Sequence, residues 1–129
     1  MMVVDSDVLI DALRGETSAR ERLDQELRTG ALATTAITAF ELRSGARSER
    51  ARGQIETLLA PLTILPFDER AAEKAAEIRR GLEAGGTPIG MADYLIAGIC
   101  LSRAASLLTR NRGHFTRIEG LRVEEPERS

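Results

Sequence analysis

Three acidic residues, Asp5, Glu41 and Asp93, stand where an ordinary surface acid is not expected. Asp5 directly follows the first apolar run of the chain. Asp93 falls on the apolar face of a predicted helix, because the residues three and four positions further on are Ile96 and Ala97. An isolated ionised carboxylate on such a face is costly, and it either takes up a proton or finds a partner. These acids are therefore candidates for a functional site.

Glu41 gives the same pattern on another predicted helix. Its neighbours four positions away are Ile37 and Gly45, so we expect its side chain to face the core and to reach a shared pocket. Asp7 and Asp11 add two carboxylates beside Asp5. For Asp7 a place in the first helical turn is an equally good explanation, and Asp11 is expected on the solvated face.

Short apolar runs alternate with longer amphipathic stretches along the chain, which is the pattern of strands joined by crossover helices. The predicted strands are 1–4, 31–35, 62–65 and 105–109, with a fifth at an edge over 121–123. The predicted helices are 8–13, 18–30, 37–45, 50–59, 68–85 and 91–103. This alternation predicts an α/β fold with a parallel sheet covered on both faces.

Polar residues follow four of these strands, at the end where open parallel sheets bind ligands. They are Asp5, Thr35, Asp68 and Asn111. Asp68 is explained as the cap of the helix after it.

The fold should bring Asp5, Glu41 and Asp93 to one edge of the sheet. Carboxylates that close raise each other's pKa, and a divalent cation relieves the repulsion. Oxygen ligands favour Mg²⁺ or Mn²⁺, and such a metal activates water for attack on a phosphodiester. The chemistry predicted is metal-dependent phosphoryl transfer.

Composition limits the remaining classes. The 129 residues fit one domain over 1–129, and 18 basic residues against 20 acidic ones exclude binding of nucleic acid by a strongly basic surface. The single cysteine, Cys100, excludes an intramolecular disulfide or a thiolate zinc site, and we expect it in the core of a cytoplasmic protein. No apolar run is long enough for a membrane span.

Four segments in order carry a family resemblance. They are Val4–Asp11, Thr35 with Glu41 and Leu42, Pro88–Ala97, and Leu108–Asn111 with Phe115. Together they resemble a PIN-domain ribonuclease of the VapC toxin type, from Asp5 to about Val123. The resemblance implies a three-layer α/β/α sandwich around a four- to five-stranded parallel sheet. It also implies an Mg²⁺- or Mn²⁺-dependent endoribonuclease toxin that cuts RNA, forms a homodimer and is neutralised by a VapB-type antitoxin.

Carried over by position, Asp5, Glu41 and Asp93 match the catalytic, metal-holding acids of the family. Asp5 and Asp93 would hold the metal, and Glu41 would hold it directly or through water and help to orient the attacking water. The residues expected to support this site are Asp7, Thr35, Thr109 and Asn111.

The end of the chain departs from the family pattern. Many members carry a further acid where this chain has Asn111 and His114, which leaves open whether one metal binds or two. Asn111 can coordinate through its amide oxygen or bond to a ligating acid. We expect His114 to be a surface histidine, with general acid or phosphate contact as its alternative roles. Arg110 and Arg112 are expected to contact the substrate.

Other functions remain open at this point. Asp5-Ser6-Asp7 resembles the nucleophile motif of haloacid dehalogenase phosphatases, although the only lysine, Lys74, lies within a predicted helix. A catalytically silent module that keeps the fold and binds a protein is a second alternative. A DNA substrate is a third, because nothing in the sequence reads a 2′-hydroxyl.

Overall fold

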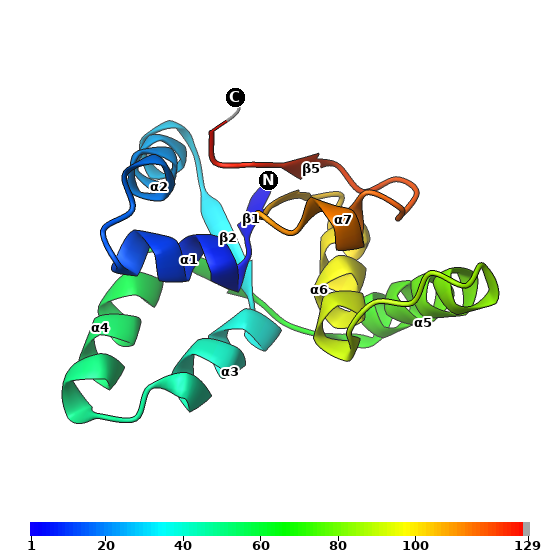
Figure 1. Ribbon diagram of the computed structural model, residues 1–129, viewed down its shortest axis with the longest axis horizontal. Helices are drawn as coiled ribbons and strands as arrows, with labels where there is room; N and C mark the ends of the chain where they lie inside the picture. Colours follow the sequence, from blue (N-terminus) through cyan, green and yellow to red (C-terminus); the bar gives the residue numbers. More distant parts are fainter. Residues whose placement is uncertain (128–129) are drawn as a thin grey trace.

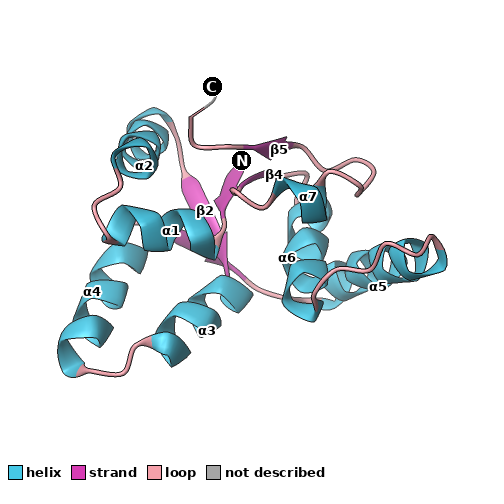
Figure 2. Cartoon of the chain, viewed as in Figure 1, coloured by secondary structure: helices cyan, strands magenta, loops and turns pink. Residues whose placement is uncertain are grey.

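A parallel β-sheet runs through the middle of the molecule (Figures 1 and 2). The computed structural model describes residues 1–127. Within that range the five strands are β1 (Met2–Val4), β2 (Leu32–Thr35), β3 (Thr63–Leu65), β4 (Ser106–Leu108) and β5 (Val123–Glu124). Their order across the sheet is β3-β2-β1-β4-β5, and every neighbouring pair is parallel. This confirms the predicted parallel sheet, with the last strand at an edge.

Helices cover both faces of the sheet, as predicted (Figure 2). Over residues 1–127 they are α1 (Ser6–Leu13), α2 (Thr17–Thr29), α3 (Ala36–Gly45), α4 (Glu49–Leu59), α5 (Glu69–Ala84), α6 (Met91–Ser102) and α7 (Arg112–Phe115). The first four pack on one face, and α5, α6 and α7 pack on the other. The predicted α/β/α sandwich is therefore confirmed.

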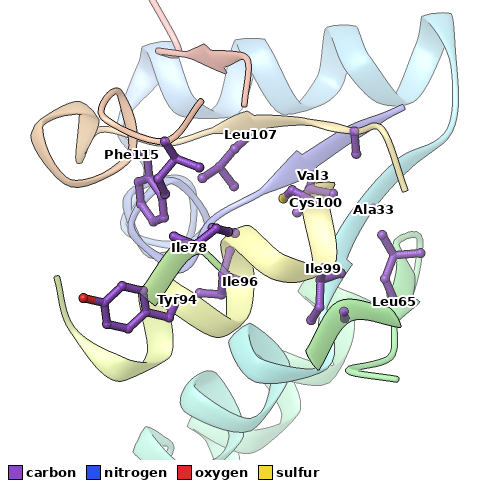
Figure 3. Close-up of a cluster of buried hydrophobic side chains, with 14 residues drawn as sticks. Val3, Ala33, Leu65, Ile78, Tyr94, Ile96, Ile99, Cys100, Leu107 and Phe115 are labelled. Atoms are coloured by element: carbon purple, nitrogen blue, oxygen red, sulfur yellow. The ribbon is translucent and has the colours of Figure 1, made fainter. Parts of the chain in front are cut away.

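Successive side chains along each strand point to opposite faces of the sheet. Val3 and Leu107 are fully buried in the cluster that includes residues of α5 and α6, shown in Figure 3. Their neighbours Val4 and Leu108 are buried in the second cluster, against α1 to α4. Cys100 belongs to the first cluster and is fully buried, which confirms its predicted place in the core.

The helices α5 and α6 pack in very close contact. A Cβ atom built on Gly98 of α6 would lie 2.6 Å from the backbone oxygen of Ala71 and 2.7 Å from the Cβ of Ala75, both on α5. Only a glycine fits that distance without moving the backbone of α5. This contact fixes α6, and with it Asp93 in the first turn of α6.

The strand order reverses at β1. The chain builds outward from β1 through β2 to β3, and it then returns to the other side of β1 for β4 and β5. Such a reversal opens a crevice at the carboxyl ends of the two strands that flank it, here β1 and β4. Asp5 and Thr109 are the residues that directly follow these strands.

One feature of the fold adds to the sequence prediction, and another agrees with it. The four-residue helix α7 was not predicted, because it is too short to show a helical period. Asp68 accepts a hydrogen bond from the Ala71 amide at 3.0 Å, so its predicted role as the cap of α5 is confirmed. None of the described helices has the length and apolar character to cross a membrane.

Candidate active site

Asp5 lies at the centre of the site, where β1 ends and α1 begins. Its Oδ1 accepts a hydrogen bond from the Ser6 amide at 2.8 Å, and its Oδ2 accepts one from Thr109 Oγ1 at 2.8 Å. The residue is only 6% exposed. The Thr109 bond spans β1 and β4, so it fixes the carboxylate at the reversal of the strand order.

Burial raises the pKa of Asp5 to about 6, and the neighbouring carboxylates of Asp7 and Asp93 add to the shift, while the bonds from Thr109 and Ser6 oppose it. Asp5 is thus a buried acid within electrostatic reach of two others. This is the arrangement that a bound cation would stabilise.

Asp7 lies in the first turn of α1 and is tied to the segment after β4. Its Oδ2 accepts from the Arg110 amide at 3.0 Å and lies 3.3 Å from Thr109 Oγ1. Burial raises its pKa, against the effect of the bonds from Arg110, Val8 and Thr109. Thr109 Oγ1 in turn accepts from the Asn111 amide at 3.0 Å. Asp7, Thr109 and Asn111, predicted to support the site, therefore form one hydrogen-bonded group around Asp5.

Asp93 enters from the other face of the sheet, in the first turn of α6. Its side chain is partly buried, and its Oδ2 lies 2.7 Å from His114 Nδ1. The same ring nitrogen lies 2.9 Å from Asn111 Nδ2. His114 is half exposed, which agrees with a surface position, but the sequence reading missed its contact with Asp93. His114 lies on the short helix α7, which the sequence did not predict. No sequence signal therefore indicated this contact.

Glu41 does not face the core, and that prediction was wrong. Its side chain is exposed, because the buried face of α3 is formed by Thr38, Ala39 and Leu42. It nevertheless reaches toward the other acids: partial desolvation and the carboxylate of Asp93 both raise its pKa. The helix α3, which carries Glu41, contacts both α1, which begins beside Asp5, and α6, which has Asp93 in its first turn.

Thr35 is fully buried at the start of α3. Its Oγ1 accepts from the Thr38 amide at 3.0 Å and thereby caps the helix. The helix that Thr35 caps carries Glu41, six residues further on, and the supporting role of Thr35 stays a prediction.

The two arginines expected to contact substrate differ in their surroundings. Arg112 makes one long ion pair, 3.5 Å from Nε to Glu125 Oε1, with its side chain 39% exposed. The guanidinium of Arg110 contacts the carboxylates of Asp11, Glu16 and Glu127. The structure thus leaves Arg112 more accessible than Arg110, and the substrate role of both stays a prediction.

The donor set fits a hard divalent cation in kind, since it consists of carboxylate oxygens around a buried acid whose pKa is raised by its neighbours. Within residues 1–127, no three acid, histidine or cysteine side chains converge closely enough to hold one ion as they stand. The acids therefore match the ion in chemistry and charge, and their side chains must reorient for it to be held by three of them.

Comparison with known proteins gives the family. The chain matches the PIN domain over residues 2–121. It is 36% identical over 122 residues to the ribonuclease VapC10 of Mycobacterium tuberculosis, covering 95% of this chain and 91% of that protein. It is 33% identical over 128 residues to the tRNA(fMet)-specific endonuclease VapC of Salmonella typhimurium, covering 95% and 96%.

A solved structure agrees with these relatives. The VapBC2 complex of Rickettsia felis, bound to a DNA fragment from its promoter, superposes with a TM-score of 0.90 at 26% identity, over 96% of this chain and 97% of that one. The fold, the clustered acids and these matches lead to one conclusion. The chain belongs to the PIN-domain family, among the VapC ribonucleases.

Proposed function

We propose that this protein is an Mg²⁺- or Mn²⁺-dependent endoribonuclease and the toxin of a type II toxin–antitoxin pair. The observation that carries the proposal is Asp5, a buried acid between β1 and β4 whose pKa is raised to about 6 with Asp7 and Asp93 in electrostatic reach. Two relatives are named a ribonuclease and a tRNA(fMet)-specific endonuclease, which supports RNA as substrate.

Asp5 and Asp93 would hold the metal, with Glu41 binding it directly or through water. When bound, the cation supplies activation of water and neutralisation of charge on the phosphodiester. The chain's own residues position these groups. Thr109 fixes the Asp5 carboxylate through a 2.8 Å bond, and Glu41, on α3, would help to orient the attacking water.

Substrate contact would come from arginines next to the acids. Arg112 follows Asn111 directly and has a single long ion pair, so its guanidinium can exchange Glu125 for a phosphate. A partly exposed ion pair contributes only about 0–1 kcal/mol, and this exchange is therefore accessible to an RNA backbone. Arg110 would first have to leave three carboxylates.

The test is cleavage of RNA by the purified protein without any partner. Total tRNA and a structured RNA pool are incubated with Mn²⁺, with Mg²⁺ and with excess EDTA, for the wild type, for Asp93→Asn and for Asp24→Asn. Asp24 is an exposed acid on α2 and serves as the matched control. Discrete fragments that need metal and Asp93, and that the control still produces, would support the proposal.

Several outcomes would contradict it. Cleavage that persists in EDTA, or in the Asp93→Asn variant, would refute the proposed metal site. Cleavage of DNA but not RNA would point to the other substrate. The absence of any cleavage by folded, metal-loaded protein would favour a silent binding module. The comparisons give no support to a phosphatase, and Lys74 lies on α5 beside Glu77.

We infer that a partner of the VapB type binds in an apolar groove on the molecule. The groove has a volume of about 710 Å³ and lies between α1, α2 and α4, with Leu9, Leu13, Leu23 and Leu27 among its lining residues. Leu13 and Leu27 are partly exposed there. Since the solved relatives include a member of the VapBC family of toxin–antitoxin systems, we assign this groove to an apolar segment of the antitoxin.

Two consequences of the toxin assignment can be measured in cells. Expression of the chain alone should arrest growth of a bacterial host, and coexpression of the antitoxin should restore it. Harmless expression of folded protein would contradict the toxin assignment.

A homodimer is also proposed. Phe40 on α3 and Met91 on α6 are large apolar side chains that are 68% and 52% exposed, and the two helices contact each other. Such side chains are typical of a surface that another protein covers. Light scattering after size exclusion should give the mass of two chains for the wild type and of one chain for Phe40→Glu, and a monomeric wild type would refute the dimer.

A further inference from the structure

Arg110 is the most connected side chain beside the site. Its Nε donates to Asp11 Oδ2 at 2.7 Å, and its Nη2 donates to Glu16 Oε1 at 2.9 Å. Its Nη1 contacts Glu127. The bond to Glu127 is the main cause that raises the pKa of Arg110. One guanidinium thus joins α1, the start of α2 and the end of the described chain.

The backbone of the same residue reaches the acid cluster. The Arg110 amide donates to Asp7 Oδ2 at 3.0 Å, and the guanidinium holds Asp11. Asp7 and Asp11 are four residues apart, so they lie on one face of α1 and repel each other. Arg110 therefore contacts this face of α1 twice, through its backbone amide at Asp7 and through its side chain at Asp11. These two contacts keep α1 against the end of β4.

Charge argues against a phosphate contact at Arg110. Three carboxylates surround its single positive charge, and the group as a whole is therefore negative. A phosphate would have to displace at least one carboxylate while approaching the others. Arg112, with one long ion pair, does not have this obstacle.

We propose that Arg110 is a positioning residue for the acid cluster and not a substrate contact: its side chain holds α1, at Asp11, against the end of β4, and thereby keeps Asp5 and Asp7 in register with Thr109. This inference rests on the proposed nuclease function. Thr109, the residue before Arg110, donates to Asp5 Oδ2, so a shift of the Arg110 backbone moves the partner of the central acid. A displacement of about 1 Å in such a group can lower a rate by about 100-fold.

The first test separates turnover from substrate binding. Arg110→Gln and Asp11→Asn each break the contact between the arginine side chain and α1. Neither the guanidinium nor the Asp11 carboxylate is hydrogen-bonded to Asp5, Asp7 or Asp93 within the described residues. Arg117→Gln is the control, because Arg117 is exposed and makes no ion pair within residues 1–127. We measure kcat and KM on an RNA that the wild type cuts, and RNA affinity by fluorescence anisotropy in EDTA.

Both variants should lower kcat by about 10-fold to 100-fold, with KM and RNA affinity within about 2-fold of the wild type. The double variant should be no slower than the slower single variant, because both changes break the same contact, the one between Arg110 and Asp11. An unchanged kcat with a raised KM and weaker RNA binding would identify Arg110 as a substrate contact and overturn the proposal. Additive losses in the double variant would also overturn it.

The second test does not depend on cleavage. Amide hydrogen exchange should be faster in Arg110→Gln and in Asp11→Asn over residues 6–11 and 109–111, and unchanged over α6. Equal exchange in all three segments would refute the positioning role, even in a protein that cuts RNA. If the wild type cuts no RNA, the proposed function fails, and the exchange result still decides whether Arg110 positions α1.

Discussion

Replacing Asp5 with asparagine should make the metal-free protein more stable at neutral pH. The wild-type carboxylate is 6% exposed and close to Asp7 and Asp93, and these surroundings raise its pKa from 3.8 to about 6. At pH 7 the folded protein therefore holds an ionised acid in a place that disfavours the charge. Asparagine keeps the shape and removes the charge.

The pKa shift sets the size of the effect. Raising the pKa of Asp5 from 3.8 to about 6 corresponds to about 3 kcal/mol of folding free energy. Asparagine Oδ1 can still accept from the Ser6 amide, but the Thr109 hydroxyl must turn to accept from Nδ2. That rearrangement costs about 1 kcal/mol. The net gain expected for Asp5→Asn is about 2 kcal/mol.

The stability that Asp5→Asn gains over the wild type must increase as the pH rises. An acid whose folded pKa is raised binds its proton more tightly in the folded state, so its stabilising contribution is complete below the unfolded pKa near 4 and is lost as pH rises through about 6. The wild type should thus lose stability between about pH 4 and pH 6 relative to Asp5→Asn. The difference should then stay constant above about pH 7.

Urea unfolding in EDTA at pH 4.0, 5.0, 6.0 and 7.5 measures this difference, with Asp24→Asn as the exposed control. Added Mn²⁺ at about ten times its dissociation constant should stabilise the wild type by about 1.4 kcal/mol and narrow the gap. A variant that is less stable than the wild type at pH 7.5, or a difference that does not change with pH, would refute this account of Asp5.

Three further predictions concern packing, the histidine and the groove. Gly98→Ala should destabilise the protein by about 3 kcal/mol in urea unfolding, since the new Cβ would lie 2.6 Å from the Ala71 oxygen; a loss below about 1 kcal/mol would contradict the close packing of α5 and α6. His114→Ala should lower kcat less than about 10-fold, and a loss above about 100-fold would show that His114 is a general acid beyond its contact with Asp93. Leu27→Glu should weaken antitoxin binding in calorimetry by at least about 10-fold with kcat unchanged, and unaltered binding would exclude the groove.

Much of the fold could be predicted because its signals are local. The strands 31–35 and 105–109 and the helix that begins at Met91 follow from apolar runs, periods and breakers within a few residues of each other. The cap Asp68 needed only its position before a helical pattern. The short helix α7 had no such pattern, and the contact of His114 with Asp93 was missed with it.

The prediction for Glu41 shows the limit of periodicity. Its neighbours at helical spacing gave an apolar stripe, but α3 packs on Thr38 and Leu42, one step around the helix. A sequence pattern gives only the approximate direction of the apolar face of an isolated helix. The packing of α3 against α1 and α6 then decides which edge of that face is buried.

The sequence by itself determined the α/β class, the parallel sheet and the acids Asp5, Glu41 and Asp93 as one candidate site, since strand alternation and the edge rule for parallel sheets depend only on order along the chain. Only the tertiary structure decided which groups surround Arg110. Its partners Asp11, Glu16 and Glu127 lie up to 99 residues away in the chain, and no local pattern reports such contacts. An arginine beside an acidic site contacts either substrate or its own protein, and the choice depends on which carboxylates the fold brings within reach.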